Sequence, residues 1–220
     1  MEFFEYISSS SSIIIREFLN HLKIIGLSLP FSIGIGVPTG IFISRHPKAA
    51  NIVIDIASIL MTIPSLALFG IMVVILSPFG AGLGVTPAVI ALIIYSLLPI
   101  IRNTLVAIQS LDPQMIEAAK GMGMTESQIL FKIRLPLSIP TIMSGVRNAV
   151  VMGVGVATLG YFVASGGLGY FIFAGLSRSR YPMVITGVIL VSILGVLANY
   201  LLLKFEDLIT PKGLKIKDNE

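Results

Sequence analysis

The side chains able to do chemistry are few in this sequence, and their spacing fits no catalytic site. His21 and His46 lie far apart in a chain without cysteine, so they lack metal-ligand spacing, and we expect both at the surface. Gly166, Gly167 and Gly169 form a glycine-rich stretch, but no Lys-Ser or Lys-Thr pair follows it as in an ATP-binding loop. The sequence therefore predicts no catalytic residue, no metal and no cofactor on this chain.

One segment departs from the apolar character of the chain, the polar and charged stretch 117–136. Asp112 followed by Pro113 predicts a helix start just before it, because an aspartate side chain caps free amides and proline fits the first turn. An apolar stripe at i, i+3, i+4 and i+7 follows, made of Met115, Ala118, Ala119 and Met122. Gly121 and Gly123 predict the end of this helix, since glycine accepts the left-handed geometry of a helix stop.

A second short helix is predicted after these glycines. Thr125 and Gln128 form a capping-box pair that opens it. Its apolar side consists of Ile129, Leu130 and Ile133. Pro136 and Pro140 are expected to close it before the next apolar run. Two such helices, with an apolar ridge and a charged rim, are typical of a knob that docks in the groove of a partner protein.

The composition is that of a membrane protein. Hydrophobic residues make up 55% of the 220 residues and charged residues 12%, against roughly 25% charged in soluble domains. Mean hydropathy is +0.96. Long apolar runs without alternation predict helices, because backbone polar groups in lipid must be satisfied within the segment. The fold class is therefore all-α, a polytopic membrane helical bundle.

About twenty residues per span give about five transmembrane helices. They are expected at Leu22–Ile43, Ile52–Leu76, Pro87–Ala107, Thr141–Ala164 and Met183–Leu203. With the N-terminus outside and the C-terminus cytoplasmic, eleven of the fifteen Lys and Arg residues lie inside, as the positive-inside rule requires. The net charge of +4 is thereby explained by cytoplasmic loops, so no nucleic-acid partner is predicted. We expect a multi-pass protein of the cytoplasmic membrane, with the 117–136 stretch on the cytoplasmic side.

Three regions are predicted along the chain. Residues 1–21 form an extracytoplasmic amphipathic segment, since Ile14, Phe18 and Leu22 recur every four residues among polar ones. Residues 22–204 form one transmembrane domain with a loop at 112–136. Residues 205–220 form a cytoplasmic tail, whose basic residues Lys212, Lys215 and Lys217 face solvent or lipid headgroups.

Small residues recur at four-residue spacing inside the spans. Gly36 with Gly40, and Gly153 with Ala157, let helix backbones approach closely. Close packing is the simpler interpretation of both pairs, and a hinge is the alternative.

Polar residues near the ends of the spans are candidates for a translocation pathway. They are Asp55, Arg102, Asn103 and Arg147, with Asp55 and Arg102 a candidate ion pair. Snorkelling of the charged side chains toward the headgroups is the alternative. Pro64 and Tyr95, inside the second and third spans, complete this set together with Tyr161 and Phe162 of the fourth.

The 117–136 stretch resembles, position for position, the coupling loop of permease subunits from binding-protein-dependent ABC importers. The matching residues are Glu117, Ala118, Ala119, Gly123, Ile133, Leu135 and Pro136, and Gly121 is expected to take part in the same coupling. The resemblance implies the type I importer permease fold, in which this loop seats in a cleft of the ATP-hydrolysing subunit. It implies as partners two ATP-binding subunits, a second permease copy or paralogue and an extracytoplasmic binding protein, with ATP and Mg on the partner and no enzyme activity here.

Five further stretches resemble the osmoprotectant permeases of this class, which import glycine betaine, carnitine and choline. They are TIPSLALFG (62–70), YSLLPIIRNT (95–104), GMGMT (121–125), LPLSIPTIMSGVR (135–147) and GGLGYFIFAGL (166–176). Aromatic faces attract a quaternary ammonium group. Tyr161 and Phe162, with Tyr170, Phe171, Phe173 and Tyr181, are therefore candidates for a relay, or else belong to an interfacial aromatic belt.

Other functions remain open on the sequence. A related permease for another small solute, such as an amino acid, fits the same motifs. An ion-driven carrier would require inverted repeats and acidic residues at the membrane midplane, and Asp55 is the one acidic candidate. A scaffold that only anchors an ATPase is a third alternative, although spans broken by Pro and Gly fit a moving bundle better.

Overall fold

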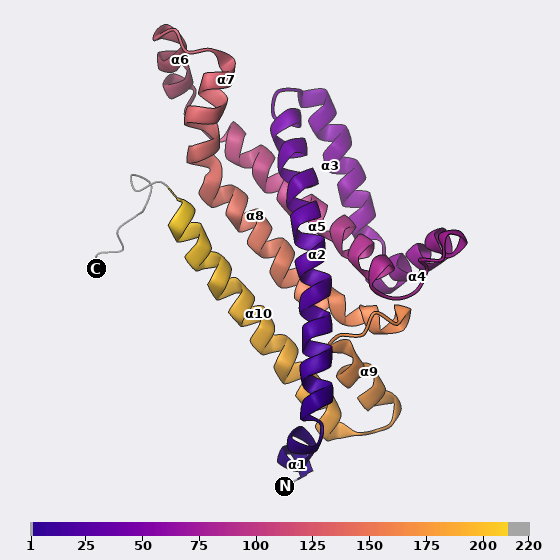
Figure 1. The fold of residues 1–220 in the computed structure, drawn as a ribbon. Coiled ribbons are helices and arrows are strands. Elements are labelled where there is room, and N and C mark those ends of the chain that lie inside the picture. Colours follow the sequence, from indigo (N-terminus) through magenta and orange to yellow (C-terminus); the bar gives the residue numbers. More distant parts are fainter. Residues whose placement is uncertain (1, 211–220) are drawn as a thin grey trace.

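The computed structural model describes residues 2–210, and their regular elements are helical (Figure 1). The α-helices are α1 (Glu2–Ser9), α2 (Ser11–Ile43), α3 (Pro47–Thr62), α4 (Ser65–Leu76), α5 (Val85–Gln109), α6 (Pro113–Gly121), α7 (Glu126–Ile129), α8 (Leu135–Val156), α9 (Gly169–Ser177) and α10 (Tyr181–Ile209). Two 3-10 turns, η1 (Ser77–Phe79) and η3 (Ala157–Val163), and one π-turn, η2 (Leu130–Arg134), join some of them. The all-α class is confirmed.

The described helices include four that are long and apolar enough to cross a membrane. They are α2, α5, the run from Glu126 to Val163, and α10. A fifth crossing exists only if α3 and α4 are taken as one span, because the two helices meet at an angle of 98°. The single helix predicted at Ile52–Leu76 is therefore wrong, because the segment is divided into two helices, although the pair can still count as the fifth span.

Pro64 explains this bend. Proline has no N–H to donate, and it drives the preceding residue out of helical geometry. Ile63 is accordingly extended, with ψ at 126°, and Pro64 itself is the N-cap of α4. The hydroxyl of Tyr95 on α5 donates to the carbonyl of Ile63 and satisfies one backbone group at the break. Tyr95 is thus bonded to the residue that precedes Pro64 at the bend.

The first helix is longer than expected. Residues 11–43 form one helix of 33 residues, about 50 Å at 1.5 Å per residue. The amphipathic segment predicted over residues 1–21 is not one element of its own, because its first half forms α1 and its second half is the start of α2. At the other end α10 continues to Ile209, and Lys212, Lys215 and Lys217 lie outside the described residues.

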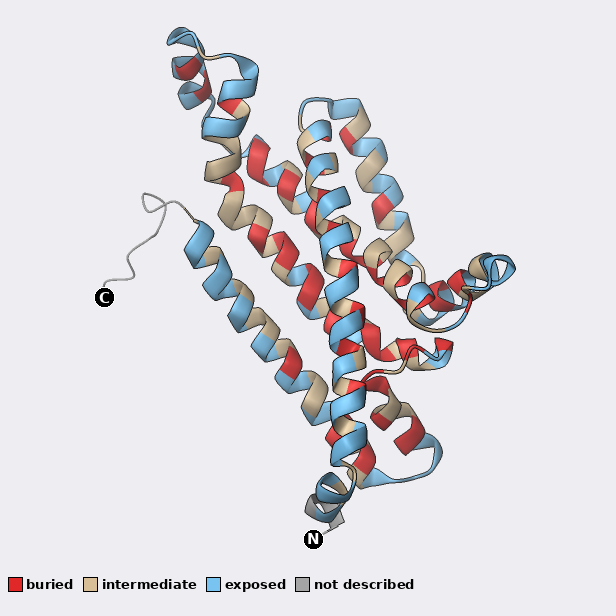
Figure 2. Cartoon of the chain, viewed as in Figure 1, coloured by how far each residue is buried: buried red, intermediate tan, exposed pale blue. Residues whose placement is uncertain are grey.

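The centre of the bundle is α5, which packs against α2 on one side and α8 on another. Buried residues concentrate on these inner helices, whereas α10 exposes most of its length (Figure 2). A side chain carbon at Gly36 would lie 2.7 Å from Ile100, and one at Gly40 would lie 2.6 Å from Thr104. The close-packing interpretation of this pair of glycines is confirmed, because only glycine lets α2 and α5 approach this closely.

The two short helices α6 and α7 project beyond one end of the bundle, and α1 and α9 lie at the opposite end (Figure 1). Pro136 and Pro140 do not close α7 as expected, since the chain continues helically from Glu126 through the π-turn into α8. Pro136 is tolerated because it falls in the first turn of α8, where its missing N–H matters least. The short helices are therefore connected to α8 without a break.

The packing at Gly40 predicts an asymmetry between two glycines of α2. Alanine at Gly40 would clash with Thr104, whereas Gly34 has no neighbouring atom within 4 Å. The helix-propensity gain is the same for both substitutions, so Gly40→Ala is expected to be less stable than Gly34→Ala by about 1–3 kcal/mol. Thermal denaturation of the two variants in the same detergent measures this difference, and equal melting temperatures would contradict the close approach of α2 and α5.

Candidate functional site

The projecting helices α6 and α7 owe their ends to local capping. The side chain of Asp112 accepts a hydrogen bond from the Gln114 N–H at 2.8 Å at the start of α6. Thr125 and Gln128 form the expected capping box, with distances of 2.8 and 3.3 Å. Between the helices Gly123 has a φ of +80°, which glycine adopts without strain. The prediction of two short helices joined at a glycine corner is confirmed.

A small apolar core holds the two helices together. Ile116 and Ala119 of α6 and Ile129 of α7 are buried, and Met124 and Ile133 pack against them. The apolar stripe predicted on the first short helix does not lie on one face, because its member Ala119 packs in this core. The other three members of the stripe, Met115, Ala118 and Met122, are exposed. We call α6, the glycine corner and α7 the knob, and these three residues form its exposed apolar ridge.

Charged residues surround this ridge. Glu117 is exposed on α6, and the Lys120 ammonium lies 2.8 Å from the Glu126 carboxylate. The hydrogen bond and charge of Lys120 lower the pKa of Glu126. Both partners are more than half exposed, so this pair adds little stability. It places one positive and one negative charge beside the apolar ridge. Gly121 and Gly123 have open space where a side chain would stand.

The remaining predicted coupling residues lie at the base of the knob. Leu135 and Pro136 border an apolar groove of about 420 Å³ between α2, α8 and α10, together with Phe131 and Phe205. Ile133 packs against the knob core. The structure thus separates these three residues from the exposed ridge at the tip.

The predicted pathway residues do not converge on one site. Asp55 and Arg102 are both exposed, and the ion pair expected between them is absent from the described residues. The side-chain amide of Asn103 donates to the Pro99 carbonyl at 2.8 Å within α5. Arg147 of α8 instead pairs with Glu206 of α10 at 3.0 Å, a partner that the sequence pattern did not reveal.

The aromatic residues after α8 do gather. Tyr161 and Phe173 stack with ring centres 5.9 Å apart, and Phe162 lies 4.7 Å from Phe173. Tyr170 adds a ring 6.3 Å from Tyr161. These rings pack face or edge against one another, so the cluster is filled by its own members. Tyr181 lies apart from it and is exposed.

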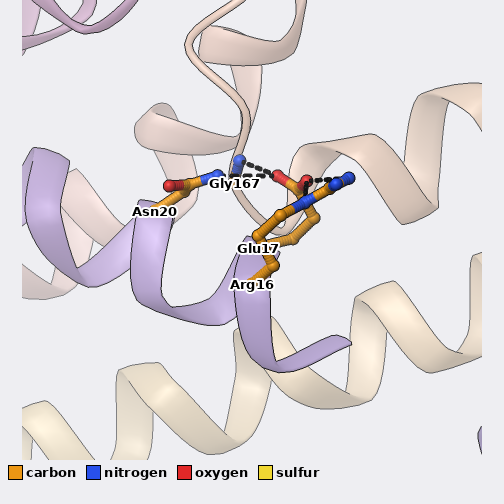
Figure 3. Close-up of polar contacts among 4 residues, drawn as sticks. All are labelled: Arg16, Glu17, Asn20 and Gly167. Carbon is orange, nitrogen blue, oxygen red and sulfur yellow. Dashed lines mark hydrogen bonds and ion pairs between the residues drawn. The ribbon is translucent and has the colours of Figure 1, made fainter. Parts of the chain in front are cut away.

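A buried polar cluster that the sequence reasoning missed joins α2 to the turn before α9 (Figure 3). Glu17 Oε2 accepts hydrogen bonds from the Gly167 N–H at 2.8 Å and from the Asn20 amide at 3.3 Å. Glu17 Oε1 pairs with the Arg16 guanidinium at 2.9 Å. The signal was available, because residues 17, 20 and 21 share one face of a helix otherwise rich in apolar residues.

His21 belongs to the same cluster and is fully buried, so the expectation that it lies at the surface is wrong. The Leu168 N–H donates to its Nδ1 at 3.2 Å, which leaves the proton on Nε2, and Nε2 donates to the Val154 carbonyl at 3.1 Å. His46 is exposed as expected. Within residues 2–210 no three His, Asp or Glu side chains come together as a metal site would require.

The arrangement defines a class of protein. It is a bundle of membrane-length helices that carries a helical knob beyond one end, joined to α8 without a loop, as a multi-pass membrane protein would be built. The chain belongs to the family of binding-protein-dependent transport system inner membrane components, whose model matches residues 32–212.

Curated relatives cover nearly the whole chain. It is 40% identical over 215 residues to the osmoprotectant import permease protein OsmW of Salmonella typhimurium, which spans 98% of this chain and 100% of that protein. It is 42% identical to the carnitine transport permease protein OpuCB of Listeria monocytogenes, over 89% of this chain and 87% of that one. The glycine betaine/carnitine/choline permease OpuCB of Bacillus subtilis is 38% identical over 89% and 88%.

Solved structures share the fold. A structure of the MetNI methionine ABC transporter matches with a TM-score of 0.80 at 22% identity, over 92% of this chain and 99% of that chain. An amino acid ABC transporter matches with a TM-score of 0.71 at 21% identity, over 93% and 97%. The expected type I importer permease fold is confirmed.

The capping box predicts a local response in the knob. Thr125→Ala removes the acceptor for the Gln128 N–H and is expected to destabilise α7 by about 0.5–2 kcal/mol. Hydrogen exchange of the amides over residues 126–129 should become faster. Ser127→Ala, at an exposed neighbour, is the control and should leave exchange unchanged. Equal exchange in both variants would show that the cap does not hold the knob.

Proposed function

We propose that this chain is the membrane-spanning subunit of an ATP-driven importer for quaternary ammonium osmoprotectants such as glycine betaine, carnitine and choline. The osmoprotectant and carnitine permeases that match it over most of its length support this substrate class. A binding protein on the outer face delivers the solute, and the chain provides the path across the membrane. Another small solute, such as an amino acid, is the alternative, and an ion-driven carrier fits less well because Asp55 is exposed and unpaired with Arg102.

We infer that the knob receives the movement of the ATP-binding subunit. Its geometry is the observation that carries the proposed function. Met115, Ala118 and Met122 offer an exposed apolar ridge, and Glu117 stands beside it on the charged rim. A ridge of this kind, with its own buried core, keeps its shape when it docks in a groove. Two partner ATP-binding subunits, one for each permease copy or paralogue, would seat these knobs, and they would bind the ATP and Mg.

Movement of the knob reaches the bundle through an unbroken helical segment. The π-turn Leu130–Arg134 joins α7 to α8 without a loop, so a displaced knob displaces the first turns of α8. Arg147 then ties α8 to α10 through Glu206, and Gly145 lets α8 pack directly on Asn103 of α5. Asn103 and Arg147 therefore act in transmitting motion between helices, whereas no side-chain hydrogen bond or ion pair among the described residues links Asp55 or Arg102 to this route.

The proposed orientation places the knob in the cytoplasm and α1 and α9 outside. The distribution of Lys and Arg supports it, and the knob must reach an ATPase that works in the cytoplasm. The aromatic residues Tyr161 and Phe162 then lie toward the outer side. Because their rings already pack on Phe173, they guide a cation past one face and do not enclose it.

Coupling is tested at two residues of the knob. Glu117→Arg reverses a rim charge, and Gly123→Trp places a large side chain at a corner with a φ of +80° and open space around it. Both variants are expected to lose most of the ATPase on co-purification and to lower transport at least tenfold. Glu5→Arg, the same charge change at the far end of the molecule, is the control and should retain both. Wild-type ATPase retention and transport in both knob variants would contradict the coupling role.

The substrate class is tested on the cognate binding protein. A thermal-shift series with glycine betaine, carnitine, choline and unrelated amino acids should raise the melting temperature only with the quaternary amines. Cation–π recognition requires no hydrogen-bond donor from such ligands, which explains the expected selectivity. Stabilisation by an amino acid alone would instead support the alternative solute.

A further inference from the structure

The polar cluster around Glu17 joins segments that are far apart in the chain. Glu17 and His21 come from the first long helix, and Gly167 and Leu168 belong to the turn between η3 and α9. Through Nε2 His21 also reaches the Val154 carbonyl, two residues before α8 ends. One face of α2 therefore holds two parts of the chain, the end of α8 and the turn that leads into α9.

The turn is shaped to receive these side chains. Gly166 and Gly167 have φ values of +74° and +95°, a backbone conformation that residues with a side chain rarely adopt. A side chain carbon at Gly166 would lie 2.8 Å from Glu17 Oε2, and one at Gly167 would lie 3.0 Å from His21 Nδ1. Both the conformation and the space at this turn require glycine.

Each side-chain polar atom of Glu17 and His21 has a partner. Both carboxylate oxygens of Glu17 are bonded and both ring nitrogens of His21 are bonded. Across the described residues the one buried side-chain polar atom without a partner is Ser138 Oγ, on another part of α8. Separation of α2 from the turn would leave the buried Gly167 and Leu168 amides without acceptors, which is costly away from water.

We propose that Glu17 and His21 are positioning residues that fix the segment 157–177 to α2, so that the two move as one rigid body when the permease changes conformation. This inference rests on the proposed transport function. The segment includes the aromatic residues Tyr161, Tyr170 and Phe173, whose place relative to α2 is then constant.

The rigid body extends to the start of α10. A side chain carbon at Gly175 would lie 2.7 Å from Val184, and one at Gly187 would lie 2.8 Å from Phe171. These contacts press α9 directly onto α10. Conformational change is then expected in the half of the bundle nearest the knob. There α8 and α10 are linked by the partly exposed Arg147–Glu206 pair and border an apolar groove.

Hydrogen exchange of the reconstituted complex, with its ATPase and in lipid nanodiscs, tests this proposal. Peptides that contain the Gly167 and Leu168 amides should be protected equally without nucleotide and with ATP trapped by a hydrolysis-deficient ATPase. Peptides of the knob should change between the same two states. Faster exchange at residues 167–168 in the ATP-trapped state would overturn the proposal, because the cluster would then open during the cycle.

Variants separate positioning from folding. Glu17→Ala is expected to raise exchange at residues 167–168 at least tenfold and to lower the maximal transport rate while ATP hydrolysis continues. Glu17→Gln keeps an oxygen acceptor for the Gly167 N–H and should restore most of the protection and the transport. Lys23→Ala, which removes an exposed charge from the same helix, should change neither. Normal protection in Glu17→Ala would overturn the proposal.

The exchange measurement needs no solute, so it is independent of the substrate assignment. If residues 167–168 behave as expected and the complex carries no quaternary amine, the proposed substrate is wrong and the rigid body stands. If the complex transports a quaternary amine and residues 167–168 lose protection with ATP, the proposed substrate stands and the rigid body is wrong.

Discussion

A membrane-spanning chain must satisfy its backbone polar groups without water, and this constraint explains where the polar side chains of this protein lie. Straight helices meet the requirement by themselves, so polar residues are needed where a helix breaks. Tyr95 donates to the Ile63 carbonyl at the bend between α3 and α4. Glu17 and His21 accept from the turn that separates η3 from α9. These two breaks in the bundle are thus each paired with side chains from a neighbouring helix.

The two ends of the molecule differ in how their segments are held together. At the α1 and α9 end, side chains and glycines join several segments into a closed network of hydrogen bonds. At the other end the knob is held by its own small core and is connected to the bundle through the π-turn and α8. A π-turn is a local irregularity often found at functional sites. In this protein it joins the knob to α8, where on the proposed function a partner's motion would enter the membrane domain.

Within residues 2–210 the polar side chains named above serve packing, capping and charge placement. This fits the proposed function of the chain within the binding-protein-dependent transport family, that of a path moved by partner subunits. The aromatic cluster illustrates the point, because its rings stack on one another and leave no enclosed cage for a cation. Strong recognition of a quaternary ammonium ion needs several aromatic faces around it. That task is better placed in a separate binding protein than in the path itself.

The sequence by itself determined the features that depend on neighbouring residues. Asp112, Thr125, Gln128 and Gly123 predicted both short helices, because caps and glycine corners act within a few residues. Apolar length predicted most of the spans, and the Gly36 and Gly40 pair predicted close helix packing. Only the tertiary structure decided that Ala119 faces inward, that the second span bends by 98° and that Asp55 and Arg102 stay apart. It also buried His21 against a turn nearly 150 residues away. These outcomes depend on partners distant in the chain, which local spacing does not encode.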